Sequence, residues 1–123
     1  MKKIILDTNA VMAISEFKLD LFAELDKVCD FVYQVFVLQG TLDELEKIKQ
    51  EQRARFREGA RLGLSILKAK GVHIILATGD VDGLLVERSK RGDLVLTQDV
   101  LLKRRLQKPY LTIRQKKKVI LVQ

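Results

Sequence analysis

Four acidic residues stand where an apolar segment ends and a helical pattern begins. Asp7 ends KKIILD, Glu44 comes three residues after Thr41 and beyond FVYQVFVLQG, Asp82 follows HIILATGDV, and Asp99 follows DLVLTQ. In a sheet wound as strand–helix–strand, such positions lie at the carboxyl ends of the strands, along the crevice where ligands bind. Four carboxylates converging there repel one another unless a cation lies between them, and oxygen-only ligand sets suit Mg²⁺ or Mn²⁺. The pattern makes the chain a candidate phosphodiesterase.

Basic residues accompany the acidic ones. The net charge is +7, from 23 Lys and Arg against 16 Asp and Glu, which favours polyanionic partners. Lys103, Arg104 and Arg105 come soon after Asp99, within one or two helical turns, so we expect them to contact phosphate groups. An ordinary solvated helix face is the structural alternative. Other basic sets lie in the middle of the chain and near its end: Arg53, Arg55, Arg57 and Arg61, then Arg114, Lys116, Lys117 and Lys118.

Each acidic residue also has a structural explanation. Asp is a favoured helix N-cap, so Asp82 and Asp99 could each serve the helix that follows. The segment Thr41-Leu-Asp-Glu44 matches a capping box, in which the Glu would bond to the backbone of Thr41. Asp7 is less well explained by capping. A cap at the carboxyl edge of a parallel sheet already points into the crevice, so capping and metal binding can occur together.

Strand and helix patterns alternate along the chain. We expect strands at 2–6, 31–38, 72–76 and 93–97, with a further apolar pair around LTI and VILV in 108–123. We expect helices at 10–27 (in two pieces), 41–50, 53–70, 83–90 and 100–107. This order predicts a single domain over residues 1–123, a three-layer α/β/α fold around a mainly parallel sheet of four to five strands.

Composition narrows the class of protein. Apolar residues make up 47% and charged residues 32% of the chain, which fits a globular protein, and no apolar run approaches a bilayer span. Met1-Lys-Lys leads straight into a strand pattern, too short for a signal peptide. The lone Cys29 excludes an internal disulfide and a cysteine-built zinc site, so we expect a cytoplasmic protein. His73 sits in an apolar run and is expected to be structural, not a catalytic base.

The sequence motifs around the four acidic residues resemble those of a known protein family. IILDTNAVM is similar to the opening of PIN-domain nucleases, VLQGTLDELEKI to their second motif, and VDGLLVERSKRGDLVLTQDVLLKRRL to their third and fourth. LLVERSKR, TQDVLLKRRL and IRQKKKVI resemble in particular the branch of archaeal PIN proteins, VapC-type toxins and small-subunit rRNA-processing endonucleases. The resemblance spans nearly the whole chain.

The resemblance implies an activity and a set of roles. It implies a PIN-like fold and hydrolysis of RNA phosphodiester bonds with Mg²⁺ or Mn²⁺. It implies catalytic, metal-binding roles for Asp7, Glu44, Asp82 and Asp99, with Asn9 and Thr97 supporting them through hydrogen bonds. Many family members have a second Asp where this chain has Gly83, and Asp80 could replace or join Asp82. Asp43 and Asp93 are weaker alternatives.

The same resemblance implies binding partners, and rival functions can be weighed against it. The resemblance implies a homodimer, and a protein partner such as an antitoxin or a ribosome-assembly factor. A second reason for a dimer is that segment 10–30 carries more apolar surface than one sheet face is expected to cover, with plain burial as the alternative; its apolar residues are Val11, Ile14, Phe17, Leu21, Phe22, Leu25 and Val28. Two Mg²⁺-dependent rivals are disfavoured, because a haloacid-dehalogenase-type phosphatase needs an acid where Asn9 stands and a receiver domain needs paired acids near its first strand. A catalytically idle PIN fold that binds RNA or protein stays open.

Overall fold

Strands and helices alternate along most of the chain in the computed structural model, which describes residues 1–123. The elements are β1 (Lys2–Leu6), α1 (Thr8–Glu16), α2 (Leu21–Val28), β2 (Tyr33–Leu38), α3 (Gln39–Ile48), α4 (Ala54–Ala69), β3 (His73–Ile75), α5 (Val81–Lys90), β4 (Leu94–Leu96), α6 (Val100–Arg105), β5 (Tyr110–Arg114) and β6 (Lys118–Val122). None of these helices combines the length and the apolar character that a membrane span requires.

The strands form one mainly parallel sheet in the order β3-β2-β1-β4-β5-β6. All neighbouring strands are parallel except β5 and β6, which pair antiparallel. The predicted fold class is confirmed, but the sheet has six strands rather than four or five, because residues 110–122 fold as a hairpin. Gln115 and Lys116, with φ of 54° and 58°, form the hairpin turn, and two left-handed residues there match the twist of the paired strands.

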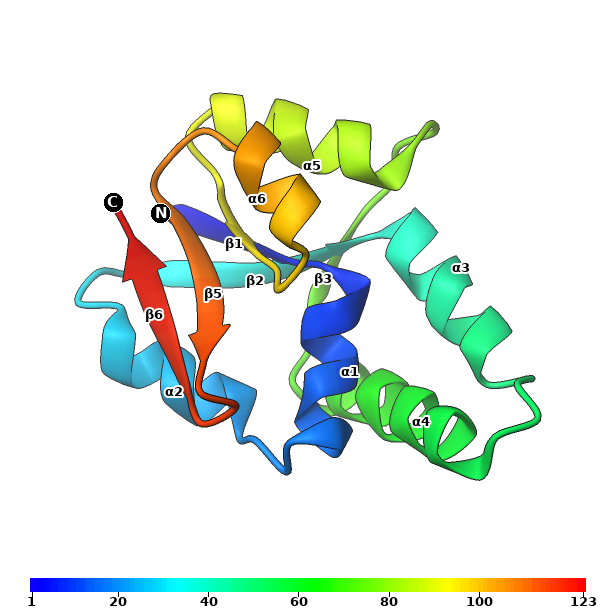
Figure 1. The fold of residues 1–123 in the computed structure, drawn as a ribbon. Helices are drawn as coiled ribbons and strands as arrows, with labels where there is room; N and C mark the ends of the chain where they lie inside the picture. The colour runs from blue at the N-terminus through cyan, green and yellow to red at the C-terminus, as the bar shows by residue number, and fades with distance from the viewer.

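The sheet separates two apolar layers. Successive side chains of a strand point to opposite faces, so Ile4 and Leu6 of β1 join the larger cluster of 18 buried residues and Ile5 joins the smaller cluster of 6. Helices α1, α2, α3 and α4 contribute to the larger cluster, and α5 and α6 to the smaller one. Figure 1 shows these helix groups on opposite sides of the sheet. The result is the three-layer α/β/α arrangement.

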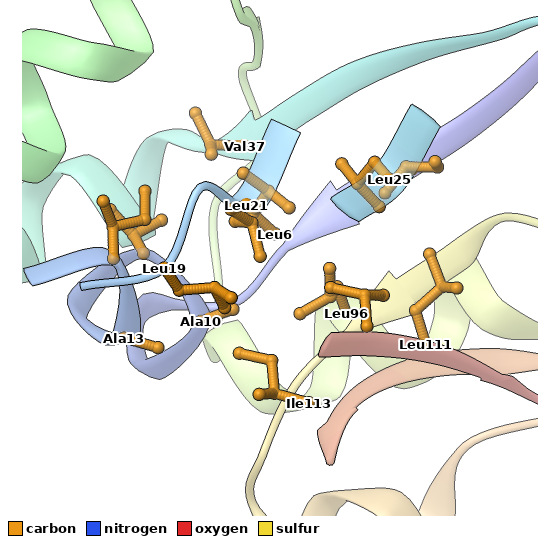
Figure 2. Packing of buried hydrophobic residues seen from close by; sticks show 14 of the residues in the cluster. Leu6, Ala10, Ala13, Leu19, Leu21, Leu25, Val37, Leu96, Leu111 and Ile113 are labelled. Atoms are coloured by element: carbon orange, nitrogen blue, oxygen red, sulfur yellow. The ribbon is translucent and has the colours of Figure 1, made fainter. Parts of the chain in front are cut away.

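The apolar residues of segment 10–30 are covered within one chain. Val11, Ile14, Leu21 and Leu25 are buried in the larger cluster, and Figure 2 shows Leu21 and Leu25 among the buried residues of this cluster, together with Leu6 of the sheet. Three others, Phe17, Phe22 and Val28, are partly buried against the same cluster. These residues therefore supply core, and the separate sequence argument for a dimer from their number was wrong.

Helices α1 and α4 approach each other closely through two glycines. A Cβ atom added to Gly63 would lie 2.6 Å from Val11 Cγ1, and one added to Gly59 would lie 3.0 Å from Met12 Cε. Gly63 is required at this separation, because real Cβ atoms do not approach a neighbour within 3.0 Å, whereas at Gly59 the flexible end of Met12 would have to shift slightly. Since α1 begins directly after Asp7 and α4 directly after Arg53, the contact fixes these two residues relative to each other.

Candidate active site

The four acidic residues singled out in the sequence line one crevice at the carboxyl edge of the sheet. Asp7 follows β1, Glu44 projects from α3, Asp82 lies in the first turn of α5, and Asp99 follows β4. All four line a crevice of about 790 Å³, a volume within the range of ligand-binding pockets. Elements far apart in the sequence therefore bring these carboxylates to the same place.

Asp7 is held by three hydrogen bonds. Its carboxylate is buried, with Oδ1 accepting from the Thr8 N–H at 2.8 Å and Oδ2 accepting from Asn9 Nδ2 at 3.0 Å and Thr97 Oγ1 at 2.7 Å. Asn9 Oδ1 also accepts from the Gln98 N–H at 2.9 Å, and Thr97 Oγ1 from the Asp99 N–H at 3.1 Å. Asn9 and Thr97, the two residues expected to support the site, thus join the ends of β1 and β4.

Glu44 is not used as a helix cap. Helix α3 begins at Gln39 with Leu38 as its N-cap, so Thr41 lies inside the helix and its hydroxyl is buried without a hydrogen-bond partner. The capping-box explanation is therefore wrong for this helix. Glu44 instead lines the crevice, and partial burial raises the pKa of its carboxyl. The nearby hydroxyl of Thr8 lowers this pKa.

Asp80 and Asp82 have different places. Asp80 is exposed and caps α5, with its Oδ2 accepting from the Gly83 N–H at 2.9 Å. Asp82 is half-buried and lines the crevice, whereas Asp80 does not. The weaker alternatives Asp43 and Asp93 lie outside the crevice, where one accepts a side-chain hydrogen bond and the other forms an ion pair. The structure thus brings Asp82 to the other three acids.

Asp99 both caps a helix and faces the crevice. Its Oδ1 accepts from the N–H groups of Leu101 and Leu102 at 2.9 and 3.1 Å, the geometry of an N-cap on α6. Its Oδ2 forms no hydrogen bond to the protein and the residue lines the crevice. Capping α6 therefore does not prevent Asp99 from lining the crevice.

The carboxylates create a negative field in the crevice. Burial raises the pKa of Asp7 above its ordinary value, the hydrogen bonds from Thr97 and Thr8 lower it, and the charges of Asp82 and Asp99 raise it further. Asp7 and Asp82 likewise raise the pKa of Glu44. A cation in the crevice would relieve this repulsion.

The donor atoms fit a hard cation in their chemistry. All four acids offer carboxylate oxygen, and Thr8 Oγ1 beside them is buried without a hydrogen-bond partner. As the side chains stand, however, no three of the Asp, Glu, His and Cys residues are close enough together to hold a metal ion. An ion bound by this set would require the carboxylates to move toward one another.

The cations that line the crevice come from α4 rather than α6. Lys103, Arg104 and Arg105 lie in the last turn of α6, and none of them lines the crevice. Arg53 and Arg55, at the start of α4, do so together with Phe56. Sequence reasoning noted these arginines as a basic set without giving them a role. Their spacing to the acids is not visible in the sequence, because it depends on how α4 packs on α1.

A crevice at the carboxyl edge of a mainly parallel α/β sheet is where such folds bind their ligands, and the acidic lining defines this one as a carboxylate site. The comparison with known families is more specific, because the model of a family described as "PIN like domain" matches residues 4–116. The chain belongs to this family. The sequence-based resemblance to PIN-domain nucleases is thereby confirmed.

Known relatives agree with this assignment. The chain is 24% identical over 123 residues to ribonuclease VapC4 of Methanocaldococcus jannaschii, covering 95% of this chain and 94% of that protein. It is 26% identical to the PIN domain endonuclease Utp24, with a TM-score of 0.75 over 97% of this chain and 90% of that one. A domain of a functionally unknown protein from Methanocaldococcus jannaschii shares the fold, with 17% identity, a TM-score of 0.56 and 94% of each chain covered.

Proposed function

We propose that this protein is a metal-dependent endoribonuclease whose single domain hydrolyses RNA phosphodiester bonds. One observation carries the proposal: four carboxylates from separate parts of the chain line one crevice, and the innermost of them, Asp7, is fixed by three hydrogen bonds. The names of two relatives, a ribonuclease and a PIN domain endonuclease, support the reaction class.

Asp7, Glu44, Asp82 and Asp99 are the residues that would hold Mg²⁺ or Mn²⁺. Such an ion, when bound, neutralises phosphate oxygens and lowers the pKa of a coordinated water. The protein's own part is to place the oxygens. Thr97 and Asn9 lock the Asp7 carboxylate in one orientation, and the raised pKa of Asp7 means that ion binding releases a proton when the pH lies near that pKa.

Neither the histidine nor the cysteine of the chain lines the crevice. His73, the chain's one histidine, lies exposed on β3 and stacks on Phe36 with ring centroids 5.0 Å apart, outside the crevice. Cys29 follows α2 and also lies outside the crevice. The reaction class supported by the crevice is therefore hydrolysis assisted by carboxylate-bound cations.

Cleavage of RNA by the wild type and two Asn variants tests the proposal. Asp7→Asn removes a crevice carboxylate, and Asp80→Asn is the matched control because Asp80 is nearby but lies outside the crevice. Wild type and Asp80→Asn should cut a single-stranded RNA in Mg²⁺ or Mn²⁺ and not in chelator, while Asp7→Asn should be at least about 100-fold slower. Equal activity of wild type and Asp7→Asn would remove the proposal.

A catalytically idle RNA- or protein-binding module is the second candidate. The observation in its favour is that no three potential metal ligands are assembled in the structure. An idle protein would bind RNA and leave it uncut in both metals. In either case we propose RNA as partner, a homodimer on the grounds of the family resemblance, and an antitoxin or a ribosome-assembly factor as the kind of protein partner.

A further inference from the structure

The crevice has too many negative charges to admit RNA without help. Six acidic residues line it: Asp7, Glu16, Glu44, Glu51, Asp82 and Asp99. The cationic residues that line it are Arg53 and Arg55. RNA carries a negative charge on every phosphate, so a strand that enters must meet compensating cations beyond any metal ion. These two arginines occupy the position where that compensation is needed.

Arg53 and Arg55 are arranged to donate hydrogen bonds. Their guanidinium carbons lie 4.7 and 4.8 Å from the ring centroid of Phe56, and neither forms an ion pair or a hydrogen bond within the protein. A guanidinium at this distance from an aromatic ring makes a cation–π contact that uses none of its N–H donors. The five N–H donors of such a group match the geometry of a phosphate.

The other arginines of the same segment are occupied. Arg57 donates to the backbone carbonyls of Glu51, at 3.0 Å, and Gln52. Arg61 forms an ion pair with Glu58 at 3.1 Å. Arg57 therefore fixes the loop before α4, and the free guanidinium groups of this segment are the two that face the crevice.

The packing of α4 holds the two arginines in place. Gly59 and Gly63 set α4 directly against α1, and α1 follows Asp7 in the chain. Arg53 is the N-cap residue of α4, and Arg55 and Phe56 are in its first turn. The arginines are thus attached to a helix whose position relative to the carboxylates is defined by close packing, as a binding subsite requires.

We propose that Arg53 and Arg55, held over the ring of Phe56, bind the phosphates of a single-stranded RNA next to the bond that is cut. The proposal rests on the ribonuclease function above for the identity of the strand. A single strand is chosen because a crevice of about 790 Å³ is of small-ligand size, so a duplex would contact only its rim. The sequence-based candidates Lys103, Arg104 and Arg105 lie outside the crevice.

Binding of a fluorescein-labelled oligouridylate, measured by anisotropy in chelator at several salt concentrations, tests the subsite. The test variant is Arg53→Gln/Arg55→Gln. The control, Arg61→Gln/Lys68→Gln, removes the same charge from exposed positions of the same helix. Two lost phosphate contacts should lower the slope of log affinity against log salt by about 1.4, since each contributes about 0.7 for a single strand. If the wild type and the double variant bind equally at about 1 M salt, the double variant should bind about 25-fold more weakly than the wild type at about 0.1 M salt.

The outcomes separate this proposal from the ribonuclease function. Each single variant, Arg53→Gln or Arg55→Gln, should show a slope change of about 0.7 and about 5-fold weaker binding, so the result does not depend on the double variant folding. A slope equal to that of the control, or no binding by the wild type, would overturn the subsite. If the slope changes as expected and the wild type cuts no RNA, the subsite stands and the proposed hydrolysis falls.

Discussion

The Thr97 hydroxyl is the group whose removal should disturb the site most without changing its shape. Thr97 is fully buried at the end of β4, donates to Asp7 Oδ2 at 2.7 Å and accepts from the Asp99 N–H at 3.1 Å. Thr97→Val keeps the branched side chain and removes both bonds, together with the longer bond that the hydroxyl accepts from Asn9 Nδ2 at 3.3 Å. A hydrogen bond to a charged group contributes about 1.5–3 kcal/mol and a neutral one about 0.5–1.5 kcal/mol. We expect the free energy of unfolding to fall by about 2–4 kcal/mol at neutral pH.

The cost of this substitution should depend on pH. Burial raises the folded-state pKa of Asp7 above its ordinary value of 3.8, while the Thr97 hydrogen bond lowers it. A group with a raised folded-state pKa contributes stability that is present below its unfolded pKa and is lost as the pH rises through its folded pKa. Thr97→Val raises that folded pKa further, because it removes a bond to the ionised form. The variant should therefore lose more stability at a pH of about 7 than at about 4.

Urea denaturation in chelator at the two pH values measures this difference. The matched control is Thr41→Val, because Thr41 is equally buried but its hydroxyl has no hydrogen-bond partner. The control should keep its stability or gain about 1 kcal/mol, since an unsatisfied polar group is replaced by a methyl. A cost for Thr97→Val that is the same at both pH values, or below about 1 kcal/mol at neutral pH, would refute the reasoning.

Three further outcomes test other parts of the molecule. Mn²⁺ at about 100 times its dissociation constant should stabilise the protein by about 2.7 kcal/mol in thermal unfolding. Asp82→Asn should lose this gain, while Asp80→Asn should keep it. Equal shifts in both variants would contradict the assignment of Asp82. Gly63→Ala should destabilise the protein by about 1–2 kcal/mol in urea, because the new Cβ would lie 2.6 Å from Val11 Cγ1 and the strain exceeds the helix propensity gained; an unchanged midpoint would show that α1 and α4 separate freely. Neutralising Lys103, Arg104 and Arg105 together should reduce the salt dependence of RNA binding less than Arg53→Gln/Arg55→Gln does, because none of the three lines the crevice. A larger effect of the triple variant would show that α6 makes the main phosphate contacts.

Strong periodic patterns made most of the fold predictable. The helix expected at 53–70 is Ala54–Ala69, and the strand expected at 2–6 is Lys2–Leu6. The apolar pattern of the helix is long, and the consecutive apolar residues of the strand are fully buried. Each segment therefore clearly favours one secondary structure. The convergence of the four acids on one crevice was accessible for a related reason: parallel strands place their carboxyl ends at one edge, whatever the detailed packing.

Local sequence signals gave wrong element boundaries and missed a strand pairing where tertiary packing determined the structure. The start of α3 at Gln39 has no polar N-cap, so the capping signal at Thr41 pointed to a boundary that does not exist. The β5–β6 turn uses Gln115 and Lys116 in the left-handed region, where Asn and Gly would be the usual signal. Hence the hairpin strands were seen as apolar segments but their pairing, and the sixth strand, were not.

The position of Arg53 and Arg55 in the crevice could not be predicted from the sequence. Nothing in the segment RARFREGARLG distinguishes the two arginines that line the crevice from Arg57 and Arg61, which bind within their own segment. The distinction arises from the crossing of α4 over α1, which depends on Gly59 and Gly63. A glycine pair four residues apart on an amphipathic helix was the available signal, and it indicates close helix packing rather than a ligand.

The four carboxylates differ in how firmly they are held, and this bears on how a cation would be bound. Asp7 is fixed by three hydrogen bonds and Asp99 by its helix cap, whereas Asp82 accepts no hydrogen bond from the protein and Glu44 has only the Thr8 hydroxyl beside it. Mutual repulsion acts on all four, so in the absence of an ion the two free side chains are the ones that can move apart. We therefore expect a bound cation to draw Glu44 and Asp82 toward the fixed pair.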